Sequence, residues 1–198
     1  VTAILAFSAI TNGDRVGLTL FSSEEERHIP VRKGRRHGLR LLRELVAAER
    51  RARRTDIRAA LETCFRASAR RGVVFVISDF HDHGYDHALR LLARKHDVTA
   101  IRVTDPLERE LPASGQLLTE DPETDVQAHR RTGSSRRRQA YADAAHAWDD
   151  ACRAAIQRAG VDLIDLTTGE DYMRPLLRYF NRRTRRRTRS RSGRGRHN

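Results

Sequence analysis

The sequence lacks the signatures of several common enzyme classes. It has no G-x-S-x-G segment, no G-x-x-x-x-G-K-S/T loop, no H-E-x-x-H segment and no G-x-G-x-x-G after an apolar run. Lysine is also scarce: only Lys33 and Lys95 could supply an amine nucleophile, and neither lies in an apolar segment. These absences leave an ordinary hydrolase, a nucleotide enzyme and amine nucleophile chemistry without support.

Cysteine and long apolar runs are equally scarce. Cys64 and Cys152 lie far apart and form no C-x-x-C motif, which argues against a zinc knuckle or a redox pair. We expect both to be small core residues of a protein in a reducing compartment, the cytoplasm. No run approaches the roughly 18 apolar residues that a membrane span needs, so none is predicted.

The net charge is unevenly distributed along the chain. Of the formal charge of +13, nine positive charges are arginines within residues 182–198, where no acidic residue occurs, so +4 remains for the rest (13 − 9). Arginine outnumbers lysine 37 to 2 along the whole chain, so an arginine cluster alone does not indicate guanidinium chemistry at a site. For a chain of 198 residues we expect one domain over residues 1–181 and a disordered arginine-rich tail over residues 182–198.

Apolar periodicity predicts alternating helices and strands. The β-α-β alternation in the second half implies a parallel sheet. The segment that contains Pro30 is expected to be an edge strand, because proline cannot donate a hydrogen bond to a neighbouring strand. Helical spacing starts with the first residues, so we expect an upstream part that includes the first strand to be missing from this chain. Strands are expected at 15–21, 28–31, 72–77, 98–103 and 161–166, and helices near 1–10, 39–46, 57–65, 89–93, 135–159 and 171–180.

Asp79 is the first candidate for a functional residue. It follows the apolar run 73–77, and the carboxyl ends of parallel strands form the crevice where α/β proteins bind ligands. Thr55 and Asp56 open a predicted helix, and their oxygens together with Asp79 suit a small hard cation such as Mg²⁺. The alternative interpretation is that Thr55 caps its helix and Asp79 caps the next element.

The loop after Asp79 allows a second hypothesis, a hydrolase or zinc protein. Histidines and carboxylates are suitable zinc ligands, although alternate residues on a loop are more often solvated. The candidate ligands are His81, Asp82, His83, Asp86 and His87.

The arginine-rich tail allows a third hypothesis, nucleic-acid binding. Residues 182–196 could neutralise phosphates without reading sequence, and such binding would weaken steeply with salt. The simpler interpretation is a solvated, disordered terminus.

Several short segments together resemble a bacterial family, that of domain of unknown function 58, whose members look like von Willebrand factor A domains. The resemblance runs from about Ala3 to Arg183, with the segments in order and at similar spacing. The segments are Asn12–Gly17 leading to Phe21, Arg54–Asp56, Ile77–Phe80, His96–Val98, Asp105–Glu108 with Leu111–Pro112, and Asp121–Thr124.

The resemblance implies a doubly wound, mostly parallel sheet with one antiparallel edge strand and a metal-ion-dependent adhesion site at its carboxyl edge. In such sites a D-x-S-x-S segment after the first strand, a threonine and a later aspartate hold one Mg²⁺ or Mn²⁺. Thr55 matches the threonine and Asp79 the aspartate. The D-x-S-x-S segment is absent from this chain, as expected if the upstream strand is missing, and Asp125 stands where relatives usually have glycine.

The resemblance also implies partners. Genes of this family commonly accompany MoxR-type AAA+ ATPases, which implies an adaptor in protein maturation or remodelling that captures a carboxylate of its partner or client. We therefore expect a non-enzymatic protein-interaction module. If the first strand is missing and was central in the sheet, the strands that would pair with it have exposed edges. We therefore also expect the isolated chain to be poorly soluble.

Overall fold

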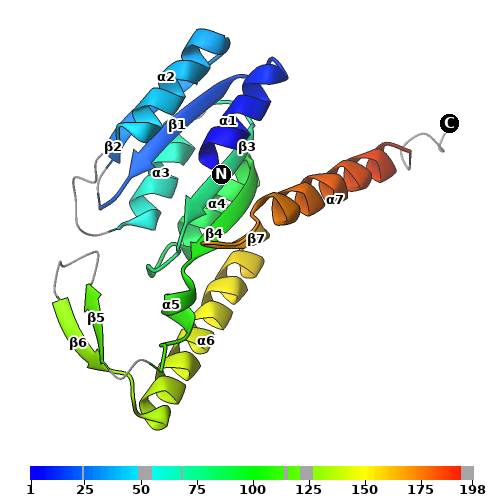
Figure 1. Cartoon of the computed structure of the whole chain (residues 1–198). Helices are drawn as coiled ribbons and strands as arrows, with labels where there is room; N and C mark the ends of the chain where they lie inside the picture. Colours follow the sequence, from blue (N-terminus) through cyan, green and yellow to red (C-terminus); the bar gives the residue numbers. More distant parts are fainter. Residues whose placement is uncertain (24, 49–54, 68, 114–115, 121–126, 193–198) are drawn as a thin grey trace.

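The computed structural model describes residues 1–23, 25–48, 55–67, 69–113, 116–120 and 127–192, in which helices and strands alternate (Figure 1). The helices are α1 (Thr2–Thr11), α2 (Arg35–Val46), α3 (Ile57–Ala67), α4 (Asp86–Lys95), α5 (Pro106–Arg109), α6 (Ser135–Arg158) and α7 (Met173–Ser192). The strands are β1 (Val16–Phe21), β2 (Glu25–Arg32), β3 (Val73–Ser78), β4 (Asp97–Thr104), β5 (Gln116–Glu120), β6 (Gln127–Arg131) and β7 (Asp162–Thr167).

Three strands form a parallel sheet in the order β3-β4-β7. Val76 pairs with Ala100, which in turn pairs with Leu163. Helix α4 connects β3 to β4, and α6 lies between β4 and β7 in the chain. The predicted parallel sheet is thus confirmed, as crossover helices allow parallel strands to pair.

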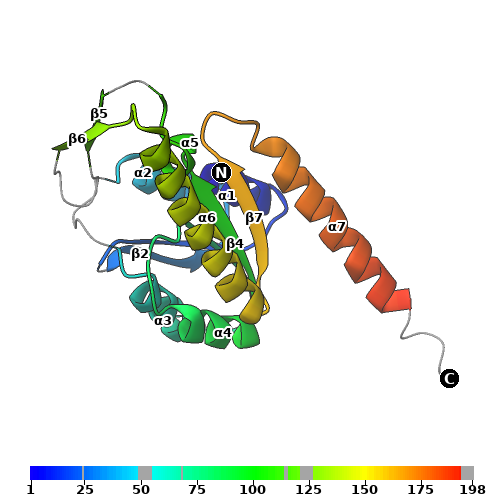
Figure 2. The same ribbon diagram turned by 90° about the horizontal axis from the view of Figure 1, so that it is seen from below.

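Helices cover both faces of this sheet (Figure 2). On one face, Val76 and Ala100 pack in a core with Leu89 of α4 and with residues of α3 and α6. On the other face, Ile101 packs with Leu176 of α7 and with residues of α1. Because successive strand residues point to opposite faces, the continuous apolar runs of β3 and β4 supply both cores.

The remaining strands form two antiparallel hairpins. β2 pairs antiparallel with β1, as predicted for the segment that contains Pro30, and β5 pairs with β6. Within the described residues, neither hairpin is hydrogen-bonded to the parallel sheet. The segment Asp121–Thr124 and Asp125 lie outside the described residues.

The last helix is longer than the sequence predicted. A helix over residues 171–180 followed by a disordered tail from Arg182 was expected, but α7 continues to Ser192. Arginine is a good helix former, and no glycine or proline interrupts residues 176–192. The Arg183 guanidinium donates to Asp97 and to the Tyr179 hydroxyl, which fixes the middle of α7 on the sheet. Residues 193–198 lie outside the described residues.

The two cysteines belong to the same core, as predicted. Cys152 is buried, and the half-buried Cys64 packs against the same cluster. Across the part of the chain that the structure describes, no helix has both the length and the apolar character that a membrane crossing requires.

Candidate functional site

The ends of β1 and β3 meet at the start of α3. The backbone carbonyl of Ser22, just after β1, accepts a hydrogen bond of 2.9 Å from the Asp56 amide. The Ile57 amide donates to the carboxylate of Asp82, in the loop after β3, over 2.8 Å. The segments that carry Thr55 and Asp79 therefore lie at the same edge of the fold.

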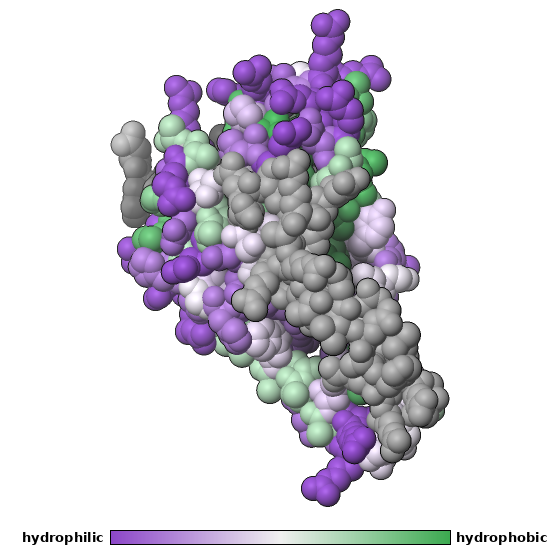
Figure 3. All heavy atoms as spheres, turned by 90° about the vertical axis from the view of Figure 1, so that its left-hand side faces the viewer, coloured by the Kyte–Doolittle hydropathy of each residue, from purple (hydrophilic) through white to green (hydrophobic). Residues whose placement is uncertain are grey.

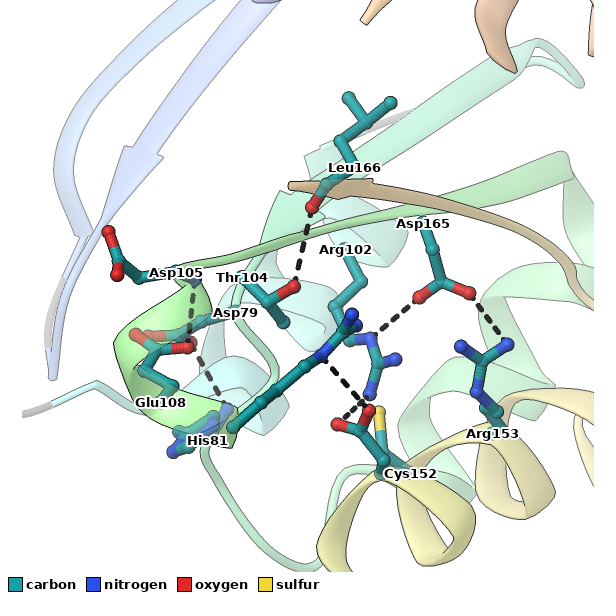
Figure 4. A network of polar contacts seen from close by, with 12 residues as sticks. Asp79, His81, Arg102, Thr104, Asp105, Glu108, Cys152, Arg153, Asp165 and Leu166 are labelled. Atoms are coloured by element: carbon teal, nitrogen blue, oxygen red, sulfur yellow. Dashed lines mark hydrogen bonds and ion pairs between the residues drawn. The ribbon is translucent and has the colours of Figure 1, made fainter. Parts of the chain in front are cut away.

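A rigid turn holds the carboxylate of Asp79. Its Oδ1 atom accepts hydrogen bonds from the Ser78 hydroxyl (3.2 Å) and from the His81 amide (3.1 Å; Figure 4). Phe80 has a φ of 60°, a left-handed conformation that costs a non-glycine residue about 1–2 kcal/mol, and its side chain is fully buried. Strained backbone that the surrounding packing maintains often marks functional sites. Asp79 itself is exposed, so its carboxylate is both fixed and accessible.

The helix cap predicted for Thr55 is wrong. The cap of α3 is Asp56, whose carboxylate accepts a 2.8 Å hydrogen bond from the Ala59 amide. Thr55 precedes this cap and is half-buried. Asp79 does not cap the next helix either, because α4 begins at Asp86 and Oδ1 of Asp79 is bound within its own turn.

A buried hydroxyl at the same edge was missed by the sequence analysis. Ser22 is only 4% exposed, and its hydroxyl has no hydrogen-bond partner among the residues that the structure describes. A buried polar group without a partner is unfavourable, so an additional group is expected beside it. Hydroxyl and carboxylate oxygens from Ser22, Thr55 and Asp79 are suitable ligands for Mg²⁺, which takes few protein ligands and keeps several waters. No sequence pattern distinguishes Ser22 from other serines in turns.

The zinc hypothesis is not supported by the structure. Within the described residues, no group of three or more His, Cys, Asp or Glu side chains is placed to hold a metal ion. The rings of His81 and His83 instead lie against the indole of Trp148, with centroid distances of 5.4 and 4.6 Å. Asp82 is hydrogen-bonded to the first amide of α3 and to the His83 amide.

The acidic residues after β4 have structural roles. Asp105 accepts hydrogen bonds of 2.9 Å from the Leu107 amide and from the Thr168 hydroxyl, and these bonds lower its pKa. The side chain of Glu108 accepts a hydrogen bond from the Asp105 amide (3.2 Å; Figure 4), which completes the capping box of α5. These two carboxylates therefore cap α5.

A buried ion network lies beside this edge of the sheet (Figure 4). The Arg102 side chain is 1% exposed and donates over 2.8 Å to both Asp149 and Asp165. Arg153 binds Asp165 at 2.7 Å, and Arg109 lies 3.5 Å from Asp149. Burial alone would lower the pKa of Arg102, but the carboxylates of Asp165 and Asp149 raise it, so the guanidinium remains charged. The sequence signal was a lone arginine within the apolar strand 97–104.

The sequence matches the model of a known protein family. The family model described as "Protein of unknown function DUF58" matches residues 1–151. The chain belongs to the DUF58 family. This result confirms the family that the sequence motifs indicated.

Mycobacterial proteins are among the similar curated sequences. The uncharacterized proteins Rv1480 of Mycobacterium tuberculosis and Mb1516 of Mycobacterium bovis are each 31% identical over 192 residues, which is 92% of this chain. The uncharacterized protein MAV169 of Mycobacterium avium is 31% identical over 160 residues, or 79% of this chain and 94% of its own length. The chain spans 60% of the length of Rv1480 and Mb1516.

Two solved structures share the fold. The conserved hypothetical protein BatB from Bacteroides thetaiotaomicron matches 89% of this chain and 82% of its own with a TM-score of 0.54 and 16% identity. An aerotolerance-related membrane protein from Bacteroides fragilis matches 84% of this chain and 80% of its own with a TM-score of 0.55 and 15% identity. At these identities the likeness concerns the fold alone.

Proposed function

We propose that this chain is a non-enzymatic protein-interaction module of the von Willebrand factor A type. The observation that carries the proposal is the Asp79 turn, in which an exposed carboxylate is fixed by a strained backbone at the carboxyl end of a parallel strand. Thr55 lies at the same edge, and helices on both faces of the sheet agree with a doubly wound fold. Fixed, accessible oxygen ligands at this edge suit recognition through a cation.

Thr55 and Asp79 would hold Mg²⁺ or Mn²⁺ together with a D-x-S-x-S segment from outside residues 1–198. The bound cation would supply an open coordination position for a carboxylate of the partner. The rigid turn at Ser78–His81 keeps Asp79 oriented before binding, which reduces the entropy cost of capturing a partner. Partner binding would therefore depend on the cation and on the position of Asp79.

The partner that we propose is a MoxR-type AAA+ ATPase, or a client protein that presents an aspartate or glutamate. Membership of the DUF58 family supports this proposal, since such genes commonly accompany those ATPases. The module would then act as an adaptor that brings clients to the ATPase for maturation or remodelling.

Manganese binding tests the proposed site directly. Mn²⁺ would be titrated into the 198-residue chain and free Mn²⁺ followed by electron paramagnetic resonance, with Asp79→Ala and Thr55→Ala beside the wild type. We expect weak binding that Asp79→Ala abolishes and Thr55→Ala weakens about tenfold, as one lost ligand of few predicts. Glu62→Ala is the matched control, because Glu62 is an exposed acid on α3 that pairs with Arg66. Equal binding by Asp79→Ala and the wild type would contradict the site.

A second candidate function is binding of nucleic-acid backbones through α7. The structure favours it in one respect, because Arg182–Ser192 continues as helix and its end projects from the body (Figures 1 and 2). Residues 184–192 are all arginine, threonine or serine, so they could contact phosphates but offer no apolar face. We expect retention of duplex DNA that falls steeply with salt and disappears when residues 184–198 are deleted. Unchanged retention by the deleted chain would refute this candidate.

A further inference from the structure

Helices α1 and α2 lie side by side, and both contact β1 (Figure 1). Gly38 of α2 is buried against Ile10 of α1, and a Cβ atom at position 38 would overlap the Ile10 side chain. The absence of a side chain at Gly38 thus allows the two helices to approach each other closely. This contact identifies the side of each helix that borders the seam between them.

Several apolar side chains beside this seam are exposed. Phe7 lies one turn before Ile10 on α1 and is 60% exposed. On α2, Leu42 and Val46 follow Gly38 at intervals of four residues, so they share its side of the helix. Leu42 is half-buried, whereas Val46 is 87% exposed. The exposed large apolar residues of the two helices, which we call the seam patch, are Ile4, Phe7, Leu39 and Val46. Contiguous apolar surface of this kind indicates a binding surface.

The exposed charged residues next to the seam patch all have one sign. Helix α1 contains no charged residue, and the exposed charged residues of α2 are arginines. Arg36, Arg40 and Arg43 follow one another by about one turn each along the outer side of α2. Glu44 is only partly exposed and lies 2.7 Å from Arg27 of β2, so its charge is compensated. The seam patch is therefore bordered by positive charge.

The hydrophilic border is visible on the surface of the molecule. Figure 3 views the side on which α2 lies and shows hydrophilic side chains that project from the upper part of the surface, with apolar residues beside them. Apolar and cationic groups thus occur together at this end of the molecule. A partner that fits it must cover apolar side chains and carry negative charge.

A second copy of the chain and a nucleic acid meet these requirements less well than a lipid surface does. Two copies related by a two-fold axis through the seam patch would bring the arginines of both α2 helices together, and like charges repel. Phosphates of a nucleic acid would pair with the arginines but would leave the apolar residues exposed. An anionic lipid surface has negative headgroups directly above an apolar layer, so it satisfies both kinds of side chain.

We propose that α1 and α2 form a docking surface for an anionic lipid bilayer. The seam patch enters the boundary between headgroups and acyl chains, and the arginines of α2 contact the lipid phosphates. The helices lie on the bilayer and do not cross it, because the 10 residues of α1 extend over about 15 Å, half of the roughly 30 Å of the apolar layer. This docking requires neither Asp79 nor a bound cation.

Tryptophan fluorescence with brominated lipids tests which part of the chain enters a vesicle. Trp148 is the single native tryptophan, so Leu39→Trp adds one reporter in the seam patch. Leu177→Trp on α7 is the matched control, because Leu177 is 54% exposed and Leu39 56%. Vesicles of equal parts phosphatidylglycerol and brominated phosphatidylcholine would be compared with unbrominated vesicles, in the presence of EDTA. We expect quenching in Leu39→Trp but not in Leu177→Trp or the wild type, since bromine quenches only nearby indoles.

Further substitutions in the Leu39→Trp chain test the two kinds of contact. Phe7→Ser should weaken binding to the anionic vesicles at least about fivefold, because it removes apolar area that the lipid would bury. Leu107→Ser, at an exposed leucine of α5, is the control and should leave binding unchanged. Replacing the three arginines at positions 36, 40 and 43 by glutamine should weaken binding by roughly tenfold or more. All these positions are exposed, so the melting temperature should stay close to that of the parent chain.

Four results would overturn the proposal. Absence of quenching in Leu39→Trp would show that the seam patch does not enter lipid. Stronger quenching in Leu177→Trp than in Leu39→Trp would assign the contact to α7. Equal binding with Phe7→Ser and with Leu107→Ser would show that apolar burial at the seam is not involved. A dimer in analytical ultracentrifugation that Phe7→Ser dissociates would show that a second copy covers the patch. Since no metal is present, these results leave Mn²⁺ binding by Asp79 untouched, and the two proposals fail independently.

Discussion

The carboxylate of Asp82 accepts a 2.8 Å hydrogen bond from the Ile57 amide and so joins the loop after β3 to the first turn of α3. The bond satisfies one of the amides that every helix start leaves without an intrahelical partner, and it places a negative charge at the positive end of the helix dipole. The two segments that carry Thr55 and Asp79 are held together by this contact.

Replacing Asp82 should loosen that connection. We expect Asp82→Ala to lower the free energy of unfolding by about 1–2 kcal/mol, as loss of a helix cap does, and Asp82→Asn to cost less because one acceptor oxygen remains. Urea denaturation would measure both. Asp143→Ala, at an exposed position on α6, is the control and should change stability by less than about 0.5 kcal/mol. An Asp82→Ala chain as stable as this control would show that the contact does not hold the loop.

In the Arg102 network, substitution of the buried Arg102 should destabilise the protein much more than substitution of the partly exposed Arg153. Arg102→Met leaves the carboxylates of Asp149 and Asp165 without their shared partner, so we expect a loss of about 3 kcal/mol. Adding Asp149→Leu and Asp165→Leu should recover most of that loss, since apolar groups of similar size replace buried ion pairs well. Arg153→Gln should cost under about 1 kcal/mol, because Arg153 is 42% exposed. Equal losses for Arg102→Met and Arg153→Gln in urea titrations would refute this account.

Stability should fall in mild acid because of His96. His96 is 2% exposed, its Nδ1 atom accepts a hydrogen bond of 3.1 Å from the Gly72 amide, and its Nε2 atom has no partner within the described part of the chain. Burial, aided by the positive charges of Lys95 and Arg71, lowers its pKa from the ordinary value of 6.5. At pH values between the lowered pKa and 6.5, the unfolded chain binds more protons than the folded chain. The contribution of His96 to the free energy of unfolding is therefore fully present above pH 6.5 and decreases as the pH falls below it.

The contribution of His96 can be isolated by substitution. His96→Gln should flatten the decrease of unfolding free energy between pH 7.5 and pH 5.5, whatever its effect on stability at pH 7.5. His28→Gln, at an exposed residue of β2, should keep the dependence of the wild type. Parallel curves for wild type and His96→Gln would show that another group controls acid stability.

The anchor of α7 offers a further prediction. The Tyr179 hydroxyl is buried, contacts Thr99 and accepts a hydrogen bond from Arg183. Tyr179→Phe leaves the ring in place but removes the shared hydroxyl, so we expect a loss of about 1–2 kcal/mol and faster amide exchange in α7. Arg182→Ala, at the exposed neighbour of Arg183, should change neither quantity. Unaltered exchange in Tyr179→Phe would indicate that apolar packing alone holds the helix.

Local patterns in the sequence were sufficient for most of the fold. The apolar run 73–77 followed by Asp79 predicted a buried strand with a carboxylate at its end, and β3 ends at Ser78 with Asp79 exposed directly after it. The long helix predicted over residues 135–159 agrees with α6 to within one residue. Such features depend on side-chain periodicity and strand ends, which neighbouring residues determine.

Contacts between distant residues were decided only by the tertiary structure. Whether Thr55 or Asp56 caps α3 depends on side-chain geometry, and both residue types are good caps. Arg102 finds its partners 47 and 63 positions further along the chain, a distance at which no local pattern operates. By itself the sequence determined β1 to β4, β7, most of the helices and the position of Asp79 at a strand end, because these follow from short-range periodicity, whereas α5, β5 and β6 were not predicted. Packing decided the caps and the ion network, because each requires segments far apart in the chain to meet.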